Sequence, residues 1–398
     1  MRADHGGTVR SVVVVTGEHS ELALAQALLR PPTVAGEPMM LLPPHLHDVH
    51  AESFPGRAVR YTSLADIRSA VDAHDPQIVF LCSAYLFSLD KVLTPRQVAE
   101  LLDFLRARHC TIATSDPLLG LARQLTLRDM DTRYLLPGER GWKRALAAAA
   151  CRVLGSRKLL PVPPMDGVVH LYPTCAPDIG DGVPRLSYFT APAVHGANTE
   201  AQEHGTHPST PPRWLFALAE IDVHTQLVQM HLRDFVENIL GMLRFAVAEG
   251  ARPTLIAPSM IVDLLAGVAT PEMELRRHLP VTEFRRRSLD AEFVFYWNAF
   301  SPSLLERLAN ELPIFVFDRG YLSRALKPYY EAAKACHFGG WEPKYLDQRQ
   351  LFSPYVLAHL AKQQRPALRQ LRQRWQASPS PDAVIRQLLG MADRSRAG

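Results

Sequence analysis

Hydrophobic runs and polar interruptions alternate along most of this chain in the manner of an α/β protein. The run Val12-Val13-Val14-Val15 is apolar on both faces, as the central strands of parallel sheets are. Ile78–Leu81 and Thr111–Thr114 are further short strand-like runs. A helical spacing of i, i+3, i+4 and i+7 lies between these two, at Val98, Leu101, Leu102 and Leu105. This alternation predicts a parallel sheet with helices on its faces.

The middle of the chain is less regular. Val168–Leu171 and Leu186–Phe189 are apolar runs that we interpret as the two strands of a hairpin. The stretch from Pro192 to Pro212 is polar, contains several Gly and Pro, and lacks apolar periodicity. We therefore interpret it as a linker.

The strand and helix alternation resumes after this linker. The predicted strands are Trp214–Leu218, Thr254–Ala257, Phe293–Trp297 and Ile314–Phe317, and helical patterns lie between them at Leu232–Leu243, Met260–Leu265 and Pro302–Asn310. No short internal repeat is present, which argues against solenoids and propellers. The pattern predicts two Rossmann-like, doubly wound α/β domains.

Composition agrees with a globular, multi-domain chain. Its 398 residues are 47% hydrophobic and 21% charged, and the net charge of only +4 gives no field that would favour nucleic acid. The five cysteines are far apart and include no CxxC, so we expect reduced thiols rather than disulfides or a zinc site. Neither a signal peptide nor a membrane span is evident, which predicts a cytoplasmic location.

One segment, Phe293 to Gly320, combines a strand, a short turn, a helix and a second strand. Ser301 occupies the expected N-cap and Pro302 the first helical position, so the helix start is well specified. Free backbone N–H groups and the helix dipole make such a start a site for phosphate or diphosphate. Glu306 lies just over one turn further on, where its carboxylate can accept hydrogen bonds from the vicinal hydroxyls of a ribose.

This segment resembles the donor site of GT-B-fold glycosyltransferases, in which a strand, a small-residue turn and a helix carrying a Glu precede a Pro and another strand. Asn298 to Ser301 match the turn, Glu306 the carboxylate, and Pro313 to Phe317 the closing strand. The chain departs from the pattern at Arg307, Glu311 and Leu312, where the family has small residues. Alternatively, Glu306 is a solvated surface carboxylate and Ser301 an ordinary cap.

The resemblance implies two domains facing a cleft, with a nucleotide-diphosphate sugar in the second. The implied boundaries are 1–207 for an acceptor domain, 208–352 for the donor domain and 353–398 for a helical tail that packs back on the first domain. We expect no metal and no cofactor beyond the nucleotide-sugar substrate. The expected donor-binding residues are Asn298, Ser301, Ser303, Glu306, Arg319, Gly339 and Gly340, with Glu220 and Asp222 on a loop nearby.

The predicted catalytic residues belong to the first half. His19 follows the first strand, where many GT-B enzymes place a catalytic base, and an imidazole is suited to take a proton from an acceptor hydroxyl. Asp116 follows another strand and is a candidate to orient that His or to bind acceptor hydroxyls; a simple Ser-Asp-Pro turn also explains it.

Other readings stay open. An epimerase of the same architecture and a non-catalytic partner or scaffold protein are the alternatives to a glycosyltransferase. Asp129-Met130-Asp131 spells D-x-D but follows a helical stretch, so we interpret it as surface. The stretch from Gln348 to Ser378 carries basic residues and no acidic ones, which fits a solvated helix face or a peripheral contact with the inner membrane face or a protein partner.

Overall fold

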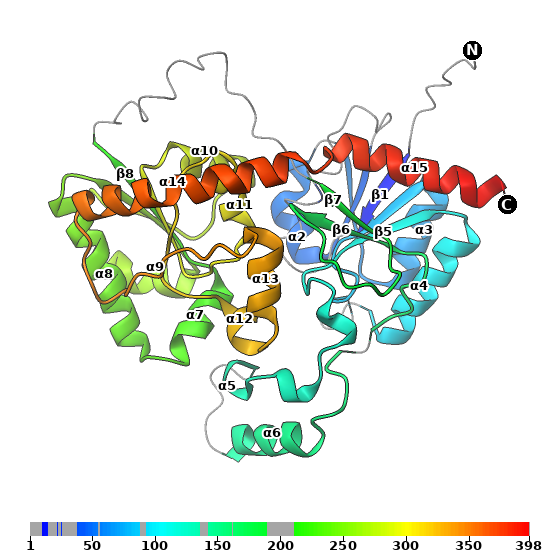
Figure 1. Ribbon diagram of the computed structural model, residues 1–398, viewed down its shortest axis with the longest axis horizontal. Helices are drawn as coiled ribbons and strands as arrows, with labels where there is room; N and C mark the ends of the chain where they lie inside the picture. The colour runs from blue at the N-terminus through cyan, green and yellow to red at the C-terminus, as the bar shows by residue number, and fades with distance from the viewer. Residues whose placement is uncertain are drawn as a thin grey trace, which may run out of the picture. The chain divides into compact units, whose positions relative to one another are not determined.

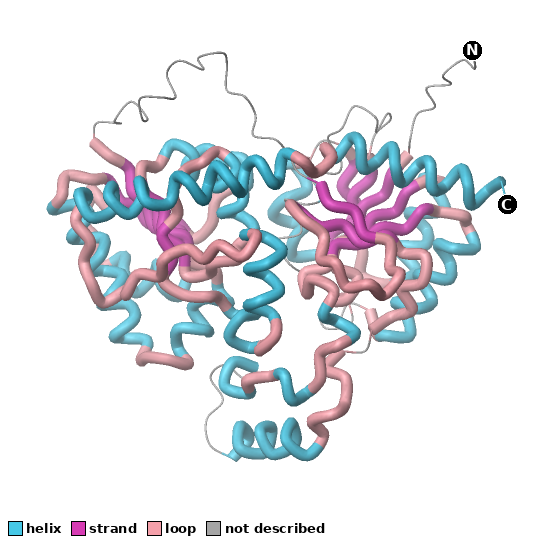
Figure 2. The backbone as a smooth tube through the Cα atoms, in the orientation of Figure 1, coloured by secondary structure: helices cyan, strands magenta, loops and turns pink. Residues whose placement is uncertain are grey.

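The computed structural model divides the chain into two compact units. It describes residues 10–14, 22, 25, 38–54, 56–87, 93–135, 142–160, 162–188 and 211–397. Unit 1 comprises Met1–Leu125, Lys158–Thr190 and Gln376–Gly398, and unit 2 comprises Thr126–Arg157 and Ala191–Trp375. Figure 1 shows the helices and strands, and Figure 2 separates them from the loops.

Unit 1 is built on a seven-stranded sheet in the order β3-β2-β1-β4-β5-β6-β7. Its strands are β1 (Ser11–Val14), β2 (Met39–Leu42), β3 (Arg57–Arg60), β4 (Ile78–Leu81), β5 (Thr111–Ser115), β6 (Val169–Pro173) and β7 (Arg185–Tyr188). Every neighbouring pair is parallel. Residues Val12 to Val14 have no exposed surface, because a central strand of a parallel sheet is covered on both faces.

The predicted hairpin in this unit is wrong. Strands β6 and β7 do pair, with His170 opposite Arg185 and Pro173 opposite Tyr188, but they run parallel. Two adjacent parallel strands require a connection that returns to the starting edge of the sheet, and the intervening chain from Thr174 to Pro184 makes that return. The apolar runs were recognised correctly, but their pattern carries no information about relative direction.

The helices of unit 1 include α2 (Pro44–His50), α3 (Leu64–His74), α4 (Pro95–Ala107) and α15 (Pro381–Ala397). Helix α15 contributes Val384, Ile385 and Leu388 to the core of this unit, and Thr111 Oγ1 donates to the carbonyl of Leu388 at 3.4 Å. The end of the chain, Gln376–Gly398, is therefore part of unit 1. The two units differ from the predicted domain boundaries, since 126–157 and 353–375 belong to unit 2.

Unit 2 contains a five-stranded parallel sheet in the order β10-β9-β8-β11-β12. Its strands are β8 (Arg213–Ala217), β9 (Arg252–Ile256), β10 (Glu274–Arg276), β11 (Phe293–Tyr296) and β12 (Phe315–Val316). Its helices include α5 (Thr132–Leu135), α6 (Trp142–Val153), α7 (Glu220–Leu227), α8 (Leu232–Ala248), α9 (Ser259–Ala266), α10 (Val281–Asp290), α11 (Pro302–Ala309), α12 (Tyr321–Ala325), α13 (Tyr329–Phe338) and α14 (Pro354–Gln376).

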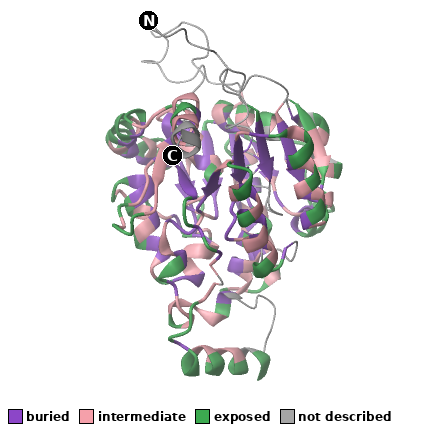
Figure 3. Ribbon diagram, turned by 90° about the vertical axis from the view of Figure 1, so that its right-hand side faces the viewer, coloured by how far each residue is buried: buried purple, intermediate pink, exposed green. Residues whose placement is uncertain are grey.

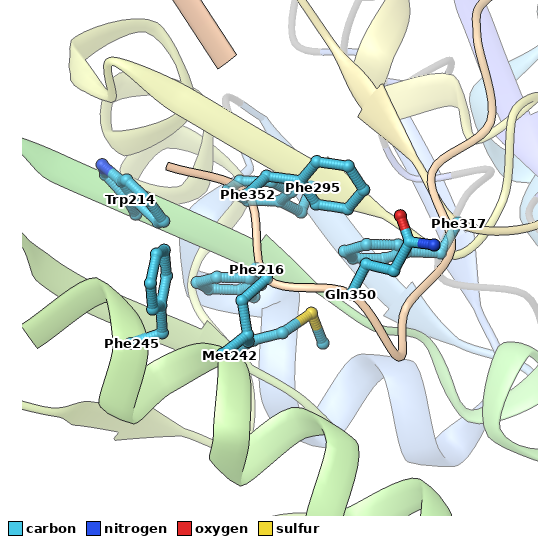
Figure 4. Close-up of a pocket in the computed structure, with 9 residues that line it drawn as sticks. Trp214, Phe216, Met242, Phe245, Phe295, Phe317, Gln350 and Phe352 are labelled. Carbon is cyan, nitrogen blue, oxygen red and sulfur yellow. The ribbon is translucent and has the colours of Figure 1, made fainter. Parts of the chain in front are cut away.

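Aromatic side chains fill one face of this second sheet. Phe295 stacks on Phe216 with ring centroids 4.6 Å apart and on Phe317 at 5.8 Å. Figure 4 shows the cavity of about 10 Å³ that these rings share with Met242 and Phe352. A cavity of that size holds about one water molecule, so this pocket is a packing gap of the core and not a ligand site.

Candidate functional site

The carboxyl ends of β11 and β12 come together at one edge of the unit 2 sheet, where ligands of doubly wound folds bind. Asn298 and Arg319 form an isolated antiparallel bridge just beyond these strands. Asn298 Oδ1 accepts from the N–H of Phe300 at 2.9 Å, which fixes the turn that leads into α11. Gly320 lies against this turn with a φ of +86°, and a Cβ at that position would come within 2.1 Å of Asn298 Oδ1. The turn therefore has a closely defined shape.

Helix α11 begins at Pro302, as predicted, with Ser301 at the N-cap position. The Ser301 side chain makes no capping bond; its hydroxyl instead lies 2.8 Å from the hydroxyl of Ser303. The sequence prediction of the helix start and of Ser301 at the N-cap position is confirmed, although the Ser301 side chain does not act as a cap. Leu304 N–H donates to the Ser301 carbonyl at 3.1 Å and Pro302 carries no N–H, so this end of α11 offers an anion the positive end of the helix dipole and the N–H of Ser303.

Glu306, the predicted ribose ligand, is half-buried and forms an ion pair with Arg285 of α10. Arg285 is 35% exposed and Glu306 27% exposed, so the pair lies at the surface of the unit. Glu306 is thus an ion-paired carboxylate at the surface of the unit, and a ribose-binding role for it stays a prediction. The sequence contains no local signal for the pair, because its two members lie on different helices.

Arg307 occupies the position that is small in the resembled family, and it is fully buried. Its guanidinium donates to the carbonyls of Pro313 at 2.7 Å, Glu292 at 2.9 Å and Ser288. Burial lowers the pKa of Arg307 to about 10, below its ordinary value. Arg307, which departs from the family pattern, therefore has a structural role: its hydrogen bonds connect α11 to the segments that precede β11 and β12.

Asp318 and Arg319 follow β12 and have different environments. The buried carboxylate of Asp318 accepts from Arg324 at 2.8 and 3.2 Å, from Gln229 at 3.1 Å and from the N–H of Gly320 at 2.9 Å. Arg319 is exposed, with its guanidinium carbon 4.1 Å from the ring centre of Tyr330. Sequence reasoning singled out the segment Asp318 to Tyr321 and gave a ligand role to Arg319 but none to Asp318, which has the larger number of hydrogen bonds.

The two predicted acidic residues after β8 also differ. Glu220 is exposed and lies 4.0 Å from His224 one turn along α7. Asp222 is 3% exposed, and burial raises the pKa of its carboxyl to about 7. Its Oδ2 accepts from the N–H of Ala219 at 3.2 Å, while its Oδ1 has no hydrogen-bond partner. The structure places Asp222 inside the unit and Glu220 at the surface.

Gly339 and Gly340 end helix α13. Both have positive φ, and their N–H groups donate to the carbonyls of Ala335 and Lys334 at 3.2 and 3.1 Å. The guanidinium of Arg374 crowds Gly339, where a Cβ would lie 2.2 Å from Nη1. These contacts account for the two glycines as a helix terminus, and a ligand role for them stays a prediction.

In unit 1, His19 lies outside the described residues. Asp116 is 4% exposed and accepts from Tyr172 Oη at 2.7 Å and from the N–H groups of Leu118 and Gly120 at 3.0 and 2.5 Å. These bonds anchor the turn after β5, in line with the turn alternative. Nearby, Tyr85 Oη lies 2.5 Å from His170 Nε2, and burial lowers the pKa of that imidazole.

The described residues offer no support for metal binding by the D-x-D sequence Asp129 to Asp131. Asp129 accepts from the N–H and hydroxyl of Thr126, and Asp131 pairs with Arg133, so the D-x-D sequence serves local structure. The described part of the chain contains no group of three His, Cys, Asp or Glu side chains arranged for a metal. None of the five cysteines takes part in a disulfide in the structure. No described helix is long and apolar enough to cross a bilayer.

No protein-family model matches this chain, and no curated protein matches it by sequence. Solved structures do match. The glycotransferase of kitacinnamycin is 14% identical with a TM-score of 0.55, over 96% of this chain and 99% of its own. The calicheamicin glycosyltransferase is 13% identical with a TM-score of 0.54, over 97% and 99%. The glycosyltransferase VinC, solved in complex with dTDP, is 14% identical with a TM-score of 0.54, over 97% and 100%.

The chain has the GT-B fold. This likeness extends over both sheets, so it confirms the predicted architecture of two Rossmann-like units. At 13–14% sequence identity, the likeness concerns the fold alone. Within that GT-B fold, β11, α11 and β12 bring Asn298, Ser301 and Ser303 to one edge of the sheet. The residues of this region to which sequence reasoning gave no role are Arg285, which pairs with Glu306 from another helix, and Asp318, which accepts from Gln229 and Arg324.

Proposed function

We propose that this protein is a glycosyltransferase that moves a sugar from a nucleoside diphosphate sugar to an acceptor. The observation that carries the proposal is the uncapped start of α11 at the carboxyl edge of a GT-B sheet. Support comes from similar structures over nearly the whole chain that are glycosyltransferases, of which VinC was solved with dTDP and SpnG with thymidine diphosphate. Because one fold hosts several functions, the site has to be tested directly.

On the donor side, the diphosphate binds at the first turn of α11, with the hydroxyls of Ser301 and Ser303 beside it. Arg319 is the exposed cation at the end of the neighbouring strand and neutralises charge that develops on the leaving diphosphate. Glu306 accepts from the ribose hydroxyls in addition to its ion pair with Arg285, since a carboxylate can accept about four hydrogen bonds. Protein groups thus replace a metal ion in this proposal.

On the acceptor side, unit 1 contributes His19 as the base that takes the proton of the attacking hydroxyl. This assignment rests on its position after β1 in the sequence. Transfer forms a bond from the acceptor oxygen to the anomeric carbon and breaks the bond from that carbon to the diphosphate oxygen. The proton leaves the acceptor to His19, and the nucleoside diphosphate leaves with the bonding electrons.

The proposal is tested by thermal-shift measurements with the diphosphates of thymidine, uridine, guanosine, cytidine and adenosine. At least one should raise the melting temperature, with thymidine diphosphate tested first. Glu306→Gln should weaken binding of that nucleotide by about ten- to a hundred-fold, as expected for a lost charged hydrogen bond. Glu237→Gln is the matched control, because Glu237 is also an ion-paired helix glutamate but lies on α8.

Turnover separates a catalyst from a binding protein. His19→Ala should retain nucleotide binding and lose transfer from the corresponding sugar nucleotide, measured as release of nucleoside diphosphate. The absence of a shift with all five nucleotides would sink the donor-site proposal. Loss of binding rather than turnover in His19→Ala would overturn the role of that residue.

A further inference from the structure

Helix α6 presents an apolar face to solvent. Trp142, Leu146 and Val153 are 72%, 61% and 81% exposed. Together with Ala149 they stand at i, i+4, i+7 and i+11, which places all four on one side of the helix. Most of the described residues of this helix are exposed, and Figure 3 colours exposed residues green on the ribbon. A stripe of large apolar side chains in water is unfavourable and marks a surface that binds something.

The opposite side of α6 is attached to the rest of unit 2. Ala147, Ala148 and Cys151 are half-buried on that side, facing the 3₁₀ turn Leu127–Asp129 and α5. This segment is itself fixed by backbone bonds from Asp131 to Ala325 and from Lys327 to Asp129, at 2.8 and 2.9 Å. The apolar stripe therefore points outward from a supported helix, which Figure 1 shows beyond α5 and α12.

Basic residues border the stripe. At about 100° per residue, Lys143 and Arg152 lie roughly a quarter-turn to either side of it. Residues 142–157 contain four basic side chains, Lys143, Arg144, Arg152 and Arg157, and no acidic one. An apolar stripe with an aromatic residue, bordered by cations alone, has the chemistry of a helix lying in the interface of an anionic bilayer, where Lys and Arg extend to the phosphates.

From this arrangement we infer that α6 docks the protein on anionic lipid membranes. The stripe of this twelve-residue helix is about 18 Å long and only one side chain wide. A stable protein interface buries about 800 Å² per partner, so the stripe alone is too small for a second copy or another protein. Binding to a bilayer does not require a complementary protein surface. Apolar side chains that insert below the headgroups and basic side chains that contact the phosphates are sufficient.

The basic helix predicted from sequence for a membrane contact, α14, has a different surface. It turns Leu357, Leu360, Leu368, Leu371 and Trp375 inward. Among its cations, Arg369 and Arg372 lie 3.6 and 3.0 Å from Glu311. The apolar side of α14 is therefore used within unit 2, whereas that of α6 is exposed.

The test is co-flotation of the full chain with vesicles of phosphatidylglycerol and phosphatidylcholine in equal parts, and with phosphatidylcholine alone. The wild type should bind the anionic vesicles and lose binding in high salt. Trp142→Ala/Leu146→Ala/Val153→Ala should lower the partition coefficient by more than about ten-fold. Arg152→Gln and Arg157→Gln should each lower it by about five-fold.

Matched controls are Leu264→Ala on α9 and Tyr355→Ala on α14, which remove exposed apolar side chains elsewhere and should leave binding unchanged. Quenching by brominated lipid should affect the wild type more than Trp142→Phe. No binding of the wild type, or equal binding of the triple variant, would overturn the inference. A wild-type dimer that the triple variant abolishes would assign the face to a second copy and overturn it as well.

Discussion

Asp222 gives the sharpest prediction for stability. This carboxyl is buried in the first turn of α7, accepts one hydrogen bond from the N–H of Ala219, and lies near the negative charge of Asp318. Burial raises its pKa from 3.8 to about 7. Between those two values the folded protein binds a proton that the unfolded chain has lost. The free energy of unfolding should therefore fall as the pH rises from about 4 to about 7. Above about pH 7, Asp222 should cause no further change.

The size of the effect follows from the pKa difference. About three pKa units at about 1.4 kcal/mol each give an upper limit of about 4 kcal/mol for the cost of the charged form. Asp222→Asn removes the ionisation and keeps an oxygen for the N–H of Ala219. We expect the variant to be more stable than the wild type at pH 8 by about 1–3 kcal/mol and to differ little from it at pH 4.

The assay is urea denaturation followed by tryptophan fluorescence across this pH range. All five tryptophans belong to unit 2, namely Trp142, Trp214, Trp297, Trp341 and Trp375, so the signal reports on the unit that contains Asp222. Asp263→Asn on α9 is the control. Asp263 is 57% exposed in its ion pair with Arg277, so this substitution should change the free energy of unfolding by less than about 1 kcal/mol. An unchanged pH slope in Asp222→Asn, or lower stability at pH 8, would refute the reasoning.

Three further substitutions test the contacts around the site. Arg307→Met leaves the carbonyls of Ser288, Glu292 and Pro313 without this donor and should lower the free energy of unfolding, measured by urea denaturation, by about 3 kcal/mol or more; a loss below about 1 kcal/mol would contradict this role of Arg307. Tyr172→Phe removes the bond to Asp116 and should lower the stability of unit 1 by about 1.5–3 kcal/mol, measured by circular dichroism; an unchanged transition would argue against the anchor. Gly320→Ala strains a positive φ and displaces Asn298, so both the melting temperature and the affinity for nucleoside diphosphate should fall; a loss of neither would mean that the turn is adaptable.

Sequence pattern predicted the β11–α11–β12 segment within about a residue, because each signal there is local. Phe293 to Tyr296 is a fully buried run, and Pro302 fixes the first helical position. The direction of β7 was not predictable in the same way, since an apolar run has the same appearance in either orientation. Pairing direction depends on the route of the connecting chain, which periodicity does not encode.

The site itself was predictable only in part, and the reason is long-range contact. The sequence identifies Glu306 as a candidate carboxylate but not its ion pair with Arg285, and it identifies Arg307 as atypical but not as buried. A helix position flanked by Leu304 and Leu308 offered a signal, because an Arg on the apolar side of a helix needs buried acceptors. Helix α6 was not predicted, although Trp142, Leu146, Ala149 and Val153 recur at helical spacing; periodicity alone does not say whether an apolar side faces the core or solvent.

The diphosphate site at the start of α11 is the centre of this account, and one calorimetric titration tests it directly. Ser303→Glu places a carboxylate at the second position of that helix, where a negative charge stabilises the helix while occupying the anion site. Ser259→Glu puts the same charge at the start of α9 as a control. The account predicts that Ser303→Glu keeps its melting temperature and loses binding of the nucleoside diphosphate that the wild type binds, whereas Ser259→Glu binds normally. Equal binding by wild type and Ser303→Glu would contradict it.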